Sequence, residues 1–315
     1  MAAIAVLGAA GGLGYACVEK SLAADHETRA IVRTPRAALL DARAKTVVCD
    51  ALDTRELTRA IEGCAALLYC VNAPLAHWTR DLPRFLSSAI EACRASGTRL
   101  VFPGNVWSYG PGTPNTSIDE ARSLAPTSNK GRLRALLETM LAQSGVEHVI
   151  VRLPEFYGPN VANPLMGEPF RAALAGRVIT WLGGRLDVNV EYLFVPDGAE
   201  AMLQLALAPG VDNERFHIPG AGPITPRHFF ELVQTQADSR AGVRALPTWL
   251  MRATGLVVRD AREFADILHL WTDPILLDGR RYLSRFGALP STPYAAGIQR
   301  TLAWFKEHPD AKNAN

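Results

Sequence analysis

The chain has 315 residues, which is enough for one large domain or for a large domain with a smaller annex. Hydrophobic residues make up 48% and charged residues 20%, which is typical of a globular protein and excludes a disordered chain. A formal net charge of +2 offers no electrostatic basis for binding nucleic acid or a membrane surface, so we expect neither partner.

The start of the chain could be mistaken for a signal peptide. Residues 1–18, MAAIAVLGAAGGLGYACV, lack a basic start, and four glycines interrupt the apolar run. Elsewhere no segment approaches the roughly 18 apolar residues of a membrane span. Five cysteines lie in the first third, mostly in apolar runs and without a Cys-x-x-Cys pair, which favours reduced thiols. We therefore expect a cytoplasmic protein.

The first half alternates two kinds of segment. Short apolar runs predict buried strands, and amphipathic stretches at 53–64 and 80–97 predict helices. The strands are expected at 3–8, 28–33, 45–50, 65–73, 99–104 and 147–153. The spacing Asp53-x-x-Glu56 is a capping box, which marks a helix start. Because parallel strands need helical crossovers, the pattern predicts an α/β fold with a Rossmann-type doubly wound parallel sheet.

The rhythm changes after residue 153. Residues 154–192 are rich in proline and glycine with one helical piece at 169–176, and the tail from 246 is mostly helical. Further helices are predicted at 195–208 and 225–237, and a strand at 214–220. We predict a core of residues 1–153 and a smaller substrate-binding lobe of residues 154–315, which is partly interleaved with the core and covers its strand ends.

A glycine triplet carries the strongest functional signal. Gly8, Gly11 and Gly14 form G-x-x-G-x-x-G directly after the first strand and at the start of a helix. A tight turn without side chains lets backbone N–H groups approach a pyrophosphate, and the helix N-terminus favours that negative charge. The turn, with Ala10, Gly12 and Leu13, therefore predicts dinucleotide binding. The alternative is a tight strand–helix turn that binds nothing.

The end of the second strand distinguishes between cofactors. An acidic residue there would bind the ribose 2′-hydroxyl of NAD, whereas an arginine suits the 2′-phosphate of NADP. The sequence IVRTPR offers Arg33 and Arg36 and no carboxylate. We therefore expect NADP, with NAD as the second choice. The alternative is that both arginines lie at a solvated strand end.

At this point the chain resembles the short-chain dehydrogenase/reductase superfamily, in particular its extended and atypical branches, which include the NAD-dependent epimerase/dehydratase group. The resemblance covers most of the chain. It rests on segments that follow the predicted strands and on later patterns, which are GAAGGLG, VVCDALD, YCVNAP, VFPGNVWSYGPG, NKGRLRALLETMLAQSGVEHVIVRLPEFYGP, VPDGAEAM, RFHIPGAGPITPRHFFELV and LSRFGALPSTPYAAGIQRTLAWFKEH.

The resemblance implies a set of cofactor contacts. A lysine of the family holds the nicotinamide ribose, and Lys130 matches it. By the same resemblance, Asp50 and Ala51 would contact the adenine. Asn72, Ala73 and Pro74 would contact the ribose and pyrophosphate, and Pro154 and Phe156 would flank the nicotinamide amide.

The departures from the family are as informative as the matches. The family's proton-donating tyrosine lies four residues before the lysine, where this chain has Pro126, and no Tyr-x-x-x-Lys occurs anywhere. The helper serine or threonine is replaced by Gly104 and Asn105. Lys130 is nevertheless one of only five lysines among 33 basic residues, which favours a specific role. The isoflavone-reductase-like and NmrA-like members, which resemble this chain, also keep the lysine without the tyrosine.

A proton donor must then come from elsewhere. Tyr109 lies in the loop after the fifth strand, at the carboxyl end of the sheet where ligands bind in such folds. We take Tyr109 and Lys130 as the candidate catalytic residues, with a packed loop aromatic and a helix-surface lysine as the alternatives. The seven histidines show no pair at metal-ligand spacing, so no metal site is expected.

Three functions remain open. The first is an NADP-dependent oxidoreductase that transfers hydride to a small carbonyl or enone-like substrate. The second is a non-catalytic NADP-sensing regulator of the NmrA-like kind, which the missing tyrosine favours and the long second lobe disfavours. The third, a sugar-nucleotide epimerase or dehydratase, ranks lower because those enzymes keep the tyrosine. A homodimer is expected by resemblance to the family.

Overall fold

The computed structural model describes residues 2–34, 39–254 and 259–311. Its centre is a parallel sheet of seven strands in the order β11-β7-β5-β4-β1-β2-β3. The strands are β1 (Ala3–Leu7), β2 (Glu27–Val32), β3 (Lys45–Val48), β4 (Ala66–Tyr69), β5 (Arg99–Asn105), β7 (His148–Leu153) and β11 (Glu214–His217). The predicted doubly wound Rossmann-type sheet is confirmed.

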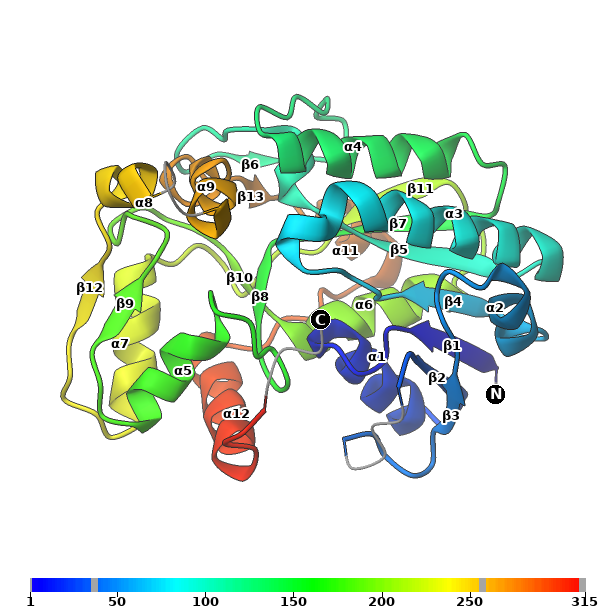
Figure 1. Ribbon diagram of the computed structural model, residues 1–315, viewed down its shortest axis with the longest axis horizontal. Helices are drawn as coiled ribbons and strands as arrows, with labels where there is room; N and C mark the ends of the chain where they lie inside the picture. Colours follow the sequence, from blue (N-terminus) through cyan, green and yellow to red (C-terminus); the bar gives the residue numbers. More distant parts are fainter. Residues whose placement is uncertain (1, 35–38, 255–258, 312–315) are drawn as a thin grey trace.

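Helices cover both faces of this sheet (Figure 1). Successive residues of β1 point to opposite faces, so that Ile4 and Val6 enter one hydrophobic cluster while Ala5 and Leu7 enter the other. One face packs against α1 (Gly12–Ala23) and α6 (Val195–Leu207), and the other against α2 (Thr54–Ile61), α3 (Trp78–Ser96) and α4 (Asn129–Ala142). This double burial explains why the central strands β1 and β4 are apolar throughout.

The strand order creates a crevice at the carboxyl ends of the central strands β1 and β4. From β1 the chain runs outward to β2 and β3, and it then returns across β1 to β4, β5, β7 and β11. The connections after β1 and after β4 therefore leave in opposite directions. In open parallel sheets, ligands bind at the carboxyl ends of the strands beside such a reversal.

Local capping fixes two helix starts that matter for the site. The Asp53 carboxylate accepts a hydrogen bond from the Glu56 N–H and begins α2, as the capping box predicts. The Ser128 hydroxyl accepts one from the Gly131 N–H and begins α4. Asp197, in the first turn of α6, instead accepts hydrogen bonds from the N–H and the hydroxyl of Thr292.

The residues after β7 build a second lobe and also return two elements to the sheet. Within the described residues these returning elements are β11 and α6. The other elements of the chain are η1 (Leu75–His77), η2 (Val106–Tyr109), β6 (Ser117–Ile118), β8 (Glu155–Tyr157), α5 (Gly167–Leu174), β9 (Ile179–Trp181), β10 (Tyr192–Phe194), α7 (Pro226–Gln236), β12 (Val243–Ala245), α8 (Thr248–Thr254), α9 (Arg259–Ala265), α10 (His269–Thr272), β13 (Leu276–Leu277), α11 (Arg280–Phe286) and α12 (Tyr294–Glu307).

The second lobe has an aromatic core. Tyr157 of β8 contacts Phe170 of α5, Phe194 of β10 and Phe229 of α7, with ring centroids 5.0–6.2 Å apart. Three parallel strand pairs support it, β10 with β8, β12 with β9, and β13 with β6. In Figure 1 the helices α5, α7 and α12 stand together, next to β9 and β12. Among the described residues, no helix has the length and apolar character required to cross a membrane.

Candidate functional site

A cavity of about 610 Å³ lies at the carboxyl ends of β1 to β4. Its walls come from the turn after β1, the ends of β2 and β3, the loop after β4 and the first turns of α3. Residues predicted from the sequence make up much of the lining, namely Gly8, Ala10, Gly11, Arg33, Asp50, Ala51, Asn72, Ala73 and Pro74. The structure thus brings four separate sequence segments to one place.

Two positions of the glycine turn have no room for a side chain. Gly8 has φ +82°, and a Cβ on it would come within 2.7 Å of the Val71 backbone. A Cβ on Gly14 would lie 2.2 Å from the Gly8 carbonyl oxygen, so Gly14 serves close packing of α1 against the turn. No side chain caps α1, and its first turn carries no acidic residue. The free N–H groups at this helix start therefore fit the phosphates of a dinucleotide.

The outer end of the large cavity is basic. Arg33 follows β2, is exposed, and has no ion pair with a described residue. Arg84 of α3 lines the same cavity and is also exposed, whereas Arg80 is paired with Asp81 at 2.6 Å. The other predicted arginine, Arg36, lies outside the described residues.

A second cavity of about 240 Å³ continues the first toward β5 and β7. The two cavities share Gly11, Cys70, Val71 and Asn72, so they form one groove across the strand ends. Predicted residues Gly12, Leu13, Pro154 and Phe156 line the second cavity. A groove with a phosphate-binding turn at its middle and a pocket on either side has the shape that a dinucleotide requires.

Arg134 is the cation that lines the second cavity. Its guanidinium donates to the Pro103 carbonyl oxygen at 2.6 Å and lies 5.3 Å from the Phe102 ring centroid and 5.9 Å from that of Trp78. Its Nε has no hydrogen-bond partner, and burial lowers the pKa of the group. Sequence reasoning missed Arg134, although it lies on α4 one helical turn after Lys130.

Lys130, the predicted ribose contact, is engaged with residues of two other segments. Its ammonium is buried, donates to the Leu75 carbonyl oxygen at 2.7 Å, and forms a 2.9 Å ion pair with Glu263 of α9. It is not among the described residues that line either cavity. The pair instead ties α4 to the second lobe, so the geometry lends no support to a contact between Lys130 and the nicotinamide ribose.

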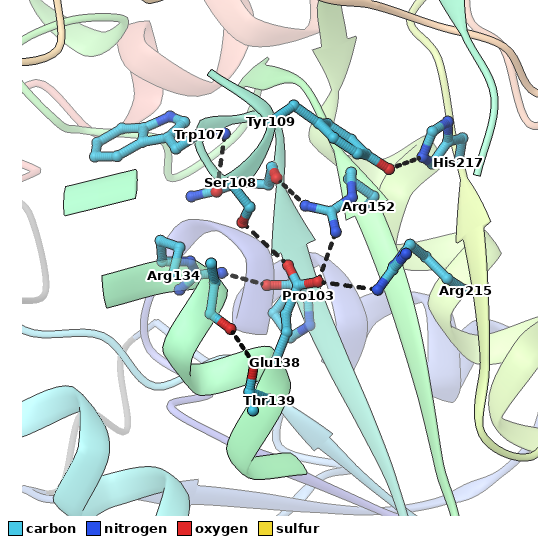
Figure 2. Close-up of polar contacts among 12 residues, drawn as sticks. Pro103, Trp107, Ser108, Tyr109, Arg134, Glu138, Thr139, Arg152, Arg215 and His217 are labelled. Atoms are coloured by element: carbon cyan, nitrogen blue, oxygen red, sulfur yellow. Dashed lines mark hydrogen bonds and ion pairs between the residues drawn. The ribbon is translucent and has the colours of Figure 1, made fainter. Parts of the chain in front are cut away.

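Tyr109 belongs to a buried polar cluster, shown in Figure 2. Its side chain is fully buried, and its hydroxyl lies 2.7 Å from His217 Nε2. His217 Nδ1 is 3.1 Å from the Ile118 carbonyl oxygen and must donate to it, so Nε2 accepts the tyrosine proton. Burial lowers the pKa of His217 to about 3, which keeps the ring neutral. Tyr109 therefore points away from the groove.

The charged centre of the same cluster is an ion pair between β7 and α4. Arg152 and Glu138 are almost fully buried and meet at 2.6 Å, and the Ser108 hydroxyl donates to the same carboxylate at 3.2 Å (Figure 2). Arg152 also lies 4.4 Å from the Tyr109 ring centroid and donates to the Asn105 carbonyl oxygen. Together with Arg134, this cluster fixes the end of β5 beside the second cavity.

Comparison with known proteins agrees with this geometry. A sequence profile of NAD(P)H-binding proteins matches residues 8–165, which is half of the chain. The chain belongs to this NAD(P)H-binding family. The matched region contains the glycine turn and most residues that line the two cavities. No curated protein sequence matches the chain.

Solved structures share the fold of this NAD(P)H-binding protein over its whole length. UDP-glucose 4-epimerase from Thermotoga maritima, solved with UDP-glucose, has a TM-score of 0.78 at 18% identity and covers 98% of this chain and 100% of its own. Bordetella bronchiseptica WbmH, solved with NAD⁺, gives 0.77 at 20% identity with coverages of 98% and 99%. Streptomyces venezuelae DesIV, a dTDP-glucose 4,6-dehydratase solved with NAD and TYD, gives 0.74 at 20% with 97% for both. The predicted resemblance to extended short-chain dehydrogenases is confirmed at the level of fold.

The NAD(P)H-binding protein has a third, small cavity of about 20 Å³ where the core meets the second lobe. Glu155 and Tyr192, paired neighbours on β8 and β10, both line it. Burial raises the pKa of the Glu155 carboxyl to about 7. Sequence reasoning missed both residues, although Glu155 lies between the predicted contacts Pro154 and Phe156. Among the described residues, no group of three or more histidine, cysteine or acidic side chains could hold a metal ion.

Proposed function

We propose that this protein is an NADP-dependent oxidoreductase that transfers hydride to a small carbonyl or enone-like substrate. The observation that carries the proposal is the continuous groove, in which an uncapped helix start lies between the basic cavity and the cavity beside Arg134. The second lobe supports a protein that binds a substrate as well as the cofactor. Its strand β8 lines the inner end of the groove and pairs with β10, which lines the adjoining small cavity.

The preference for NADP rests on the outer cavity. A guanidinium forms bidentate, charge-assisted hydrogen bonds with phosphate, so the unpaired Arg33 and Arg84 suit a 2′-phosphate. Directly after β2 the chain has Arg33 and Thr34, and it offers no carboxylate for a 2′-hydroxyl at that point. Asp50 and Asp81 are the acidic residues of the described lining. The Asp50 carboxylate accepts a hydrogen bond from the Leu52 N–H, and Asp81 is paired with Arg80.

The inner cavity would hold the nicotinamide end. When bound, the cofactor would supply the hydride, and the protein would orient both reactants. We propose that Arg134 takes the ribose-binding role that the sequence suggests for Lys130, because its guanidinium lines the cavity and keeps an unpartnered Nε. Pro154 and Phe156 would flank the nicotinamide ring, and Asn105 would present its amide to the substrate side.

Cofactor affinity is the first test. Titration calorimetry with NADPH and NADH should show tighter binding of NADPH, and Arg33→Ala should reduce that preference by at least about 10-fold, the loss of one charge-assisted contact. Arg59→Ala is the matched control, because Arg59 is exposed on α2 and lies outside the cavity lining. An unchanged preference in Arg33→Ala contradicts the assignment of NADP.

Turnover is the second test. NADPH oxidation should be measured against a panel of small aldehydes, ketones and enones, with UDP-glucose and dTDP-glucose included. We expect oxidation with at least one uncharged carbonyl compound. Tight NADPH binding without any turnover would favour the NADP-sensing regulator, a role that Pro126 at the family's tyrosine position and the diverted Lys130 support. Conversion of a sugar nucleotide would favour an epimerase or dehydratase. Cytoplasmic location and a homodimer stay predictions.

A further inference from the structure

The small cavity between β8 and the second lobe contains two polar groups without partners. Among the described residues, the Glu155 carboxyl forms no hydrogen bond and no ion pair. Tyr192 is fully buried, and its hydroxyl also lacks a hydrogen-bond partner. The Tyr192 hydroxyl is thus a buried polar group without a partner, which is unusual in folded proteins. The half-buried Glu155 carboxyl lines the same cavity, so a water molecule there would have polar partners on two walls.

The other walls of this cavity are apolar and aromatic. They include Trp107 after β5 and Trp271 at the end of the second lobe's α10. The described lining contains no arginine, lysine or histidine. Apart from Tyr192, Glu191 is the titratable residue that shares the lining with Glu155, and its carboxylate accepts a hydrogen bond from the Leu277 N–H. The Glu155 carboxyl therefore faces a site of low dielectric without a countercharge.

The small cavity adjoins the nicotinamide end of the groove. Pro154 lines both cavities, and Glu155 is the next residue along β8. On the other side, Asn105 lines the groove while the following residue, Val106, lines the small cavity. A volume of about 20 Å³ is enough for one water molecule with polar partners on its walls. The two cavities therefore share a wall at Pro154, and a water in the small cavity is the path that the proposal requires between Glu155 and the groove.

We propose that Glu155 supplies the proton in the reduction of an uncharged carbonyl substrate, through one water held between its carboxyl and the Tyr192 hydroxyl. The inference rests on the proposed function. It replaces the tyrosine that the family uses and that this chain lacks.

The step balances in atoms and electrons. Hydride adds to the carbonyl carbon and reduces it, while NADPH becomes NADP⁺. The π electron pair of the carbonyl moves to its oxygen, which takes a proton from the water. That water takes the proton of the Glu155 carboxyl, and the resulting carboxylate is reprotonated from solvent after the product leaves. No further oxidant or reductant is needed.

The protonation state of Glu155 suits this role. Burial raises the pKa of its carboxyl to about 7, so the acid form is well populated near neutral pH and can also be regenerated. Tyr192 cannot lose and regain a proton near neutral pH, because burial raises the pKa of its hydroxyl far above the ordinary value. Tyr192 therefore orients the water as a neutral donor, and the other candidate acids, Tyr109 and Lys130, are engaged with His217 and Glu263.

Turnover of Glu155 variants tests the proposal. With the best uncharged carbonyl of the panel, Glu155→Gln should lower kcat by about 100-fold with little change in the KM for NADPH. In the wild type kcat should fall as pH rises through about 7, and this limb should disappear in the variant. Glu155→Asp should restore part of the rate. Glu120→Gln is the matched control, since burial also raises the pKa of Glu120 but it lies outside the cavity lining. Unchanged rates and pH profile in Glu155→Gln overturn the proposal.

A second measurement needs no substrate. Infrared difference spectra between the cofactor-free wild type and Glu155→Gln should show a protonated carboxyl band at about pH 6 that disappears by about pH 8.5. Absence of that band at pH 6 overturns the role of Glu155 even if the protein is an active reductase. Absence of turnover in the wild type, with intact folding and NADPH binding, instead overturns the proposed function and with it the use of that proton.

Discussion

Two groups of polar residues lie near the ends of β5 and β7, and they differ in whether their carboxyl group has a partner. The carboxylate of the first, satisfied group has partners, although Arg152 Nε of that group has none, and the carboxyl of the second group has no described partner. In the first, Arg152 neutralises Glu138, and Tyr109 donates to His217. In the second, the Glu155 carboxyl and the Tyr192 hydroxyl have no hydrogen-bond partner among the described residues, and both residues line one cavity. Burying a charge is costly unless it is paired, so the first group can stabilise the fold while the second costs stability. Such a cost is expected where a protein retains a group for function.

We expect the largest loss of stability when one charge of the satisfied group is removed. Arg152→Met should lower the free energy of unfolding by about 3–5 kcal/mol, because it leaves the buried Glu138 with the Ser108 hydroxyl and the longer contact to Arg215, at 3.5 Å, in place of its 2.6 Å ion pair. Urea unfolding measures the change. The double variant Arg152→Met/Glu138→Leu should recover part of the loss, since it removes both charges. A loss below 1 kcal/mol in the single variant would contradict a stabilising role for the pair.

A change in the second group should affect the free energy of unfolding in the opposite direction, because an ionised Glu155 carboxyl destabilises the folded state. Because the pKa of Glu155 is raised from 4.5 to about 7, the folded state holds its proton longer than the unfolded state. Its contribution to stability is therefore fully present below pH 4.5 and is lost as pH rises to 7.

Glu155→Gln should abolish this fall in stability with rising pH, because glutamine does not ionise. At about pH 8 the variant should be more stable than the wild type by about 2 kcal/mol, and at about pH 4 the two should be similar. Urea unfolding at the two pH values measures the difference. A variant that loses activity while gaining stability at high pH is expected for a functional group and not for a structural one. A loss of stability at both pH values would contradict the comparison.

The smallest effect concerns Tyr109. Tyr109→Phe removes one buried hydrogen bond and should lower the free energy of unfolding by about 1 kcal/mol, because His217 Nε2 loses its donor. NADPH turnover should remain within about twofold of the wild type, since the hydroxyl points away from the groove. A large loss of kcat with unchanged stability would restore Tyr109 as the acid and place the proton donor in the satisfied group.

Much of the fold could be predicted from the sequence. Strands buried on both faces are apolar runs, and helices that cover them are amphipathic, so the alternation predicts the sheet directly. The glycine turn, the end of β2 and the loop after β4 also follow from local sequence, and the structure places them around one cavity. These features depend on a few consecutive residues, which is why a pattern can predict them.

The inner end of the groove could not be predicted in this way. Residues four apart share a helix face, so the sequence alone does not decide whether Lys130 or Arg134 of α4 lines the cavity. The structure decides through contacts with remote segments, since Glu263 and Leu75 hold Lys130 while Pro103 holds Arg134. Similarly, the isolation of Glu155 depends on β10 and α10, which pack against it from distant parts of the chain.

A crystal structure of the protein with NADP⁺ tests the central claim most directly. We expect the 2′-phosphate beside Arg33, the pyrophosphate at the start of α1, and the nicotinamide in the cavity between Arg134 and Phe156, with its reactive face toward Asn105 and the small cavity of Glu155. A nicotinamide that points out of the inner cavity, or a closed groove with the cofactor bound elsewhere, would contradict the account.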